Sequence, residues 1–327
     1  MRGRWIVWVL LLLAAGLLAG QTSGQRRLVV AADDIRSQSP ADHLPRWTGG
    51  RLAGCDQCQS GAPILWTVDG QGNRDDTSLQ VPQADRVGVR DVASGRDGAL
   101  AAVGWAISAD SRLASFVAWI SPDRARQVLT EVGAYAPYAV TVAPDGTIWT
   151  IGATLDSGMR RQVDPNVLRH YSPSGQLLAT TAISGTRRSD GGVANVAQSS
   201  TLMASDDRIG WFTLACEYVE FSFSAVELGR YTCPNGMSNA FKAGGVALSS
   251  ANDLLIGGRE VGPLSPLELN RATKTWSPVA VSGGPGNSLG LLGFDGLTLV
   301  THHQAQTYTM RRLTWAQGAA PASDPLR

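Results

Sequence analysis

The chain has 327 residues, of which 43% are hydrophobic and 37 are glycine, so it can bury a large core and is not globally disordered. Its 28 basic and 27 acidic residues leave a net charge of +1. Such a balance lacks the clustered Lys and Arg that bind a phosphate backbone, so we expect no nucleic-acid partner. Abundant glycine at regular turn signals favours many short strands over helices.

The N-terminus predicts a secretory signal peptide over residues 1–24. Arg2 and Arg4 precede an apolar run over residues 5–19, which is short for a bilayer span, and small residues follow it. An uncleaved anchor is the alternative. No second apolar run of spanning length occurs in the sequence, so we expect no membrane span after cleavage. A secreted or periplasmic location follows.

The four cysteines agree with export, because an even number in an exported chain favours disulfides. Cys216 and Cys233 lie opposite each other if the hairpin between them turns at residues 224–225, so a cross-strand disulfide is feasible. Cys55 and Cys58 favour a short-range disulfide that staples a loop. A redox-active pair and a zinc site are the alternatives, but the first lacks a βαβ setting and the second lacks two further ligands.

From residue 61 onward the sequence repeats one hairpin pattern. Its clearest copy is residues 139–152, AVTVAPDGTIWTIG, in which two alternating strands flank a Pro-Asp-Gly turn. One full unit is expected to contain four strands, at residues 138–144, 147–153, 167–172 and 176–181. The inner turn recurs roughly every 50 residues, a spacing typical of propeller blades. These turns are Asp97-Gly98, Asp145-Gly146, Asp206-Asp207, Asn252-Asp253 and Asp295-Gly296.

The sequence therefore predicts an all-β protein, a β-propeller of six four-stranded blades, with five blades as the alternative. A second recurring landmark, a strand that ends in a polar turn, gives the count of six. The propeller is expected to form a single domain over residues 25–317, followed by a flexible tail over residues 318–327. The last repeat shows only three clear strands, and residues 28–32 are expected to pair beside residues 309–315 and close the ring.

Residues 139–149, AVTVAPDGTIW, and 168–178, LRHYSPSGQLL, resemble a blade of NHL-type and gluconolactonase-like six-bladed propellers. The resemblance covers residues 61–315. It implies a superfamily that includes lactonases, lyases, quinone-dependent dehydrogenases and plain binding modules. The lactonase-type metal site that it implies uses Glu, Asn and Asp in the central channel. At the expected starts of the innermost strands only Asp91 and Asn195 are compatible with a metal, and two oxygen ligands are too few for a Ca²⁺ cage.

The predicted binding site is the channel mouth at those strand starts. Arg90, Asp91, Tyr138 and Asn195 form a polar set suited to a small polar ligand or a peptide, unless they only hold water in the channel. His170 is expected to be structural. No motif implies a cofactor or a catalytic residue. We therefore expect an exported binding or interaction module rather than an enzyme, with a gluconolactonase-like metal-dependent hydrolase of a sugar lactone or ester as the alternative.

Overall fold

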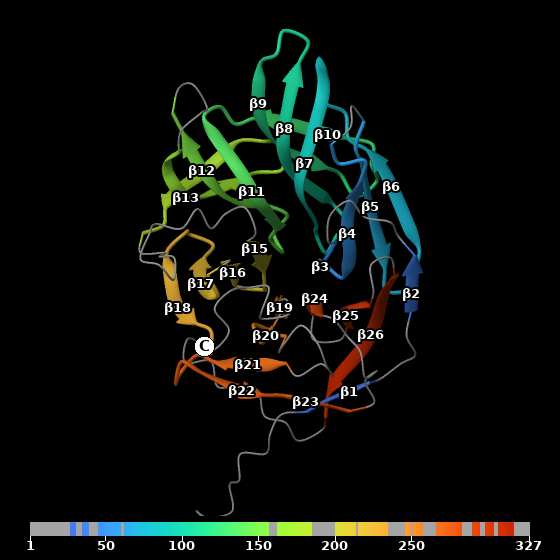
Figure 1. The fold of residues 1–327 in the computed structure, drawn as a ribbon, viewed down its shortest axis with the longest axis vertical. Coiled ribbons are helices and arrows are strands. Elements are labelled where there is room, and N and C mark those ends of the chain that lie inside the picture. The colour runs from blue at the N-terminus through green and yellow to red at the C-terminus, as the bar shows by residue number, and fades with distance from the viewer. Residues whose placement is uncertain are drawn as a thin grey trace, which may run out of the picture.

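A computed structural model shows an all-β ring of six sheets (Figure 1). It describes residues 27–30, 35–38, 45–59, 62–156, 162–184, 200–213, 215–234, 246–249, 251–257, 266–282, 290–294, 298–303 and 307–316. The predicted signal peptide and the predicted C-terminal tail lie outside these residues. Among the described residues, no helix is long and apolar enough to cross a membrane.

Five of the sheets are regular blades of four consecutive antiparallel strands. The first blade contains β3 (Arg46–Thr48), β4 (Arg51–Asp56), β5 (Ile64–Asp69) and β6 (Arg74–Ser78). The second contains β7 (Ala84–Ser94), β8 (Leu100–Ser108), β9 (Leu113–Ile120) and β10 (Gln127–Glu131). The third contains β11 (Tyr135–Val142), β12 (Ile148–Leu155), β13 (Gln162–Tyr171) and β14 (Leu177–Ala182). The fourth contains β15 (Thr201–Ala204), β16 (Arg208–Phe212), β17 (Glu217–Ser222) and β18 (Glu227–Thr232). The fifth contains β19 (Val246–Leu248), β20 (Leu254–Ile256), β21 (Leu267–Asn270) and β22 (Thr275–Pro278).

The sixth sheet contains six strands from both ends of the chain. They are β24 (Gly290–Phe294), β25 (Thr298–His303), β26 (Thr307–Trp315), β1 (Arg27–Val30), β2 (Ile35–Gln38) and β23 (Ala280–Ser282). Strand β1 pairs with β26 at Leu28↔Trp315, which confirms the predicted closure by an N-terminal strand. The regular blades in the described residues therefore number five, the predicted alternative. The sixth sheet exceeds four strands because the long β26 pairs with β1 near its end and with β2 near its start.

The third blade confirms the clearest sequence pattern. Strands β11 and β12 pair at Val140↔Thr150 and Val142↔Ile148. Between them the Gly146 N–H donates to the Ala143 carbonyl, and Gly146 has a φ of +81° that side chains other than glycine rarely adopt. The hairpin was predictable because its turn depends on a few adjacent residues.

Apolar side chains fill the spaces between neighbouring blades. Trp149 of β12 and Trp211 of β16 are fully buried in one cluster that joins the third and fourth blades. A single twisted sheet cannot cover both of its apolar faces, so each blade buries one face against the next. The innermost strands contact one another in the order β3, β7, β11, β15, β19, β24 and back to β3, so they close a ring around a central axis (Figure 1).

Both predicted disulfides are present. Cys216 and Cys233 flank the paired strands β17 and β18, and their Cα atoms lie 5.4 Å apart. Cys55 and Cys58 join the end of β4 to the turn that follows it, with a Cα–Cα distance of 5.6 Å. Both residues of this second bridge are buried.

Candidate binding site in the central channel

Arg46 crosses the channel and joins four blades. It is the first residue of β3, and its guanidinium donates to Asp91 Oδ2 of β7 at 2.7 Å and to the Val140 carbonyl of β11 at 2.7 Å. It also donates to the Leu202 carbonyl of β15 at 3.0 Å, a residue 156 positions away in the chain. The Arg46 and Asp91 side chains are only 14% and 15% exposed. A charge-assisted bond of this geometry, largely shielded from water, holds these four inner strands together.

Asp91, one of the predicted site residues, is bonded mainly to the protein itself. Besides Arg46, its Oδ2 accepts the Val140 N–H at 2.7 Å, and its Oδ1 accepts the Val92 N–H at 3.0 Å. A carboxylate with these partners fixes β7 against β11. Its contact with a ligand stays a prediction.

Arg90 and Tyr138, two further predicted residues, lie side by side on neighbouring inner strands. The Arg90 guanidinium lies 4.7 Å from the centroid of the Tyr138 ring, and it donates to the Pro137 carbonyl at 3.1 Å. Burial lowers the pKa of Arg90 below its usual value. This geometry is a cation–π contact reinforced by a hydrogen bond.

The sequence placed these residues at strand starts, and that was wrong. Arg90 lies within β7 and Tyr138 within β11, each at a break in the pairing register, between Val89 and Asp91 and between Pro137 and Ala139. Each break is a β-bulge, which leaves one residue out of the ladder and redirects its side chain. The strands therefore continue past the bulges instead of beginning there.

The space beside Arg90 and Asp91 is small. Its volume is about 30 Å³, and its lining also includes Arg46. Each molecule of liquid water takes up about 30 Å³, so this space is about the size of one water molecule. Asn195, the fourth predicted residue, lies outside the described residues.

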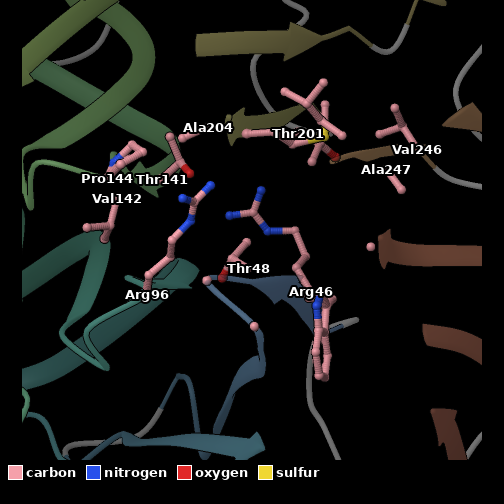
Figure 2. Close-up of a pocket in the computed structure, with 16 residues that line it drawn as sticks. Arg46, Thr48, Arg96, Thr141, Val142, Pro144, Thr201, Ala204, Val246 and Ala247 are labelled. Atoms are coloured by element: carbon pink, nitrogen blue, oxygen red, sulfur yellow. The ribbon is translucent and has the colours of Figure 1, made fainter. Parts of the chain in front are cut away.

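A larger cavity than this one lies on the opposite side of Arg46, toward the inner hairpin turns. It measures about 330 Å³ and is lined from five innermost strands, β3, β11, β15, β19 and β24, and from the turns after β3, β7 and β11. Figure 2 shows these residues around a common space. Its polar lining comprises Arg46, Thr48, Arg96, Thr141 and Thr201. Its apolar lining includes Trp47, Val142, Pro144, Met203, Val246 and Leu248.

Arg96 brings a second cation to this cavity. It belongs to the inner turn of the second blade and forms an ion pair with Asp206, which belongs to the inner turn of the fourth blade. The ion pair therefore joins the inner turns of two blades that the third blade separates. In Figure 2 the guanidinium groups of Arg46 and Arg96 point toward each other. The sixteen lining residues include these two cations, whereas their carboxylate partners, Asp91 and Asp206, are not among the lining residues.

Sequence reasoning missed both arginines. Arg46 lies in a polar region where only a three-residue strand forms, too short for an alternating pattern. Arg96 directly precedes the Asp97-Gly98 turn, and that turn was interpreted only as a marker of the repeat spacing. Its position beside a channel-facing turn was the one available signal.

His170 does not line this cavity. The His170 ring stacks on Trp149 with a centroid distance of 4.0 Å, and burial lowers the pKa of its imidazole. His302 and His303 are consecutive residues of β25 and pair with Tyr308 and Thr307 of β26. Consecutive strand residues point to opposite faces of a sheet.

No group of three or more His, Cys, Asp or Glu side chains that could hold a metal ion occurs among the described residues. Asp91, the described member of the predicted metal-compatible pair, bonds to Arg46 and to backbone N–H groups instead. The metal-dependent hydrolase stays an untested prediction.

Comparison with known proteins gives structural likeness only. No protein family matches the chain, and no curated protein sequence matches it. Among solved structures, the chain is similar to the Dos1 propeller, with 10% identity, a TM-score of 0.41, and coverage of 85% of this chain and 66% of that one. A chain of the mitotic checkpoint complex matches with 10% identity, a TM-score of 0.44, and coverage of 90% and 93%. BBS1N in complex with ARL6DN matches with 12% identity, a TM-score of 0.44, and coverage of 84% and 78%.

The sheet topology by itself identifies a β-propeller. The finer resemblance to NHL-type and gluconolactonase-like blades is not confirmed by these matches.

Proposed function

We propose that this protein is an exported β-propeller binding module, which holds a small ligand or a segment of a protein partner in the cavity at the hairpin-turn side of its channel. The observation that carries the proposal is the cavity of about 330 Å³, which five inner strands and three inner turns line with an apolar wall and two convergent cations. Ligand sites are typically concave, mostly apolar and equipped with a few placed polar groups, in volumes of about 300–1,000 Å³.

The closed ring suits such a role because it presents the cavity already formed. Arg46 fixes β3, β7, β11 and β15 relative to one another, so the side chains of these strands need little ordering when a ligand arrives. Binding to a preorganised site loses less conformational entropy.

The two disulfides support export. Disulfides persist in oxidising compartments outside the cytosol, and this chain uses all four of its cysteines in such bonds. Together with the N-terminal sequence pattern they favour a secreted or periplasmic protein.

A cavity-filling substitution tests the proposal. Thr201→Trp places a large ring in the cavity, whereas Thr180→Trp places the same ring on the exposed outer strand β14. The wild type and both variants are immobilised and incubated with the exported fraction of the source cells. Bound proteins are read on gels, and small molecules are read by mass spectrometry of the denatured eluate.

We expect at least one bound species that the wild type and T180W retain and that T201W loses, while all three melt at similar temperatures. Equal capture by all three proteins would contradict the assignment of the cavity as the binding site.

A further inference from the structure

We infer that the cavity is a receptor site for a small organic acid, whose carboxylate pairs with Arg96 and Arg46 while its apolar body lies against Val142, Met203 and Leu248. This inference rests on the proposed function and specifies its ligand class. The lining supplies both halves of the match, since two guanidinium groups and an apolar wall share one space, while the carboxylates that pair with them, Asp91 and Asp206, lie outside the lining.

The Arg96–Asp206 ion pair indicates which anion fits. It links the inner turns of the second and fourth blades, which the third blade separates, so it lies at the edge of the cavity. In the structure, Arg96 already forms an ion pair with a carboxylate, that of Asp206. A ligand carboxylate that replaces Asp206 would form the same kind of bond with Arg96.

The exchange is easy because this ion pair is exposed to water. The Arg96 side chain is 47% exposed and the Asp206 side chain 58%. Exposed pairs of this kind contribute little to stability, so Arg96 is free to turn from Asp206 to a ligand at small cost.

Arg46 is the fixed partner of this arrangement. Its bonds to Asp91, Val140 and Leu202 hold the guanidinium in place. Nη2 makes two of these bonds and Nη1 makes one, to the Leu202 carbonyl, so a second N–H of Nη1 can donate to a ligand. Thr48 adds a hydroxyl, because its Oγ1 accepts the Ser94 N–H at 2.8 Å and keeps its own O–H to donate.

The volume sets the size of the ligand. A cavity of about 330 Å³ lies at the lower end of the volumes of about 300–1,000 Å³ that small-molecule sites typically have. It therefore suits a small acid, with a carboxylate attached to one ring or one short branched chain.

The test uses 4-fluorophenylacetate as the probe and 4-fluorophenylacetamide as its neutral isostere, with binding followed by fluorine NMR of the ligand. We expect the acid to bind the wild type and the amide to bind at least about tenfold more weakly, because the amide cannot form a charge-assisted bond with either arginine. Arg96→Gln should lower the affinity for the acid at least about tenfold.

Asp206→Asn should act in the opposite direction. It should raise the affinity for the acid roughly two- to fivefold, because it removes the carboxylate that competes for Arg96. Arg112→Gln is the matched control, since Arg112 also forms an exposed ion pair, with Glu131, away from this cavity. It should leave the affinity unchanged.

Three results would each overturn the inference. They are equal affinities of the wild type for the acid and the amide, a lower affinity of D206N for the acid, and the same loss of affinity for the acid in R96Q and R112Q. Tighter binding of 4-fluorophenyl phosphate than of the acid would overturn the choice of a carboxylate. Absence of any probe binding would overturn the anion site, whereas the proposed function would still be judged by the separate loss of captured species in T201W.

Discussion

Substitution of Arg46 by Met removes the side chain that joins four blades across the channel. Met keeps much of the apolar stem but has no donor, so Asp91 loses its cation and the carbonyls of Val140 and Leu202 lose the donated bonds. The Asp91 carboxylate retains the N–H groups of Val140 and Val92. The perturbation therefore isolates the contribution of the guanidinium.

Breaking a buried ion pair by removing one partner typically costs about 3–5 kcal/mol. Asp91 is 15% exposed and keeps two backbone donors, so we place Arg46→Met at the lower end, about 3 kcal/mol. In a chain of this size that loss lowers Tm by about 6 °C.

A double-mutant cycle with Asp91→Asn separates the ion pair from the other lost contacts. We expect Asp91→Asn alone to cost about 2 kcal/mol and the double variant to cost about 3 kcal/mol, which gives a coupling of about 2 kcal/mol between Arg46 and Asp91. The free energies come from urea denaturation, with unchanged m values as the check on compactness. A loss below about 1 kcal/mol for Arg46→Met, or strict additivity in the cycle, would refute this account of the channel.

Three further predictions concern the fold. Deletion of residues 25–35 removes β1, which pairs with β26 and β23, and should lower Tm sharply. Deletion of residues 1–24 is the control and should leave Tm unchanged. Equal Tm values for the two deletions would contradict ring closure by β1. Gly152→Ala should cost several kcal/mol, because its new Cβ would overlap the Ala136 carbonyl oxygen. The Cβ of Gly70→Ala meets nothing within 4 Å, so this control should be near neutral in urea denaturation. Cys216→Ser should lower the free energy of unfolding by about 3 kcal/mol, because it removes the Cys216–Cys233 disulfide. A reducing agent that breaks this disulfide should produce a similar loss in the wild type.

The hairpin around Asp145-Gly146 was predictable because its signal is local. The turn needs a glycine with positive φ, and the flanking strands need alternating apolar residues that pack between blades. The closing strand was predictable for a different reason, since a ring with an incomplete last blade needs a strand from elsewhere in the chain. The first blade was predicted less well, because β3 has only three residues.

The candidate site depended on relations that no local pattern carries. Arg90 and Tyr138 were predicted as members of one polar set, and the structure brings them into contact through two bulges that the sequence did not indicate. The space beside them is about the size of one water molecule, whereas the larger cavity lies on the other side of Arg46.

By itself the sequence determined the class of fold and the repeating hairpin, because turn chemistry and alternation act over a few residues or one hairpin. It also predicted the closing strand and favoured the two disulfides, whose pairing the structure then decided. Only the tertiary structure decided that Arg46 reaches Leu202 and that Arg96 meets Asp206 across the third blade. The physical reason is that these partners come from different blades. Their distance is set by how the blades pack around the axis, and each side chain alone reads as an ordinary surface arginine.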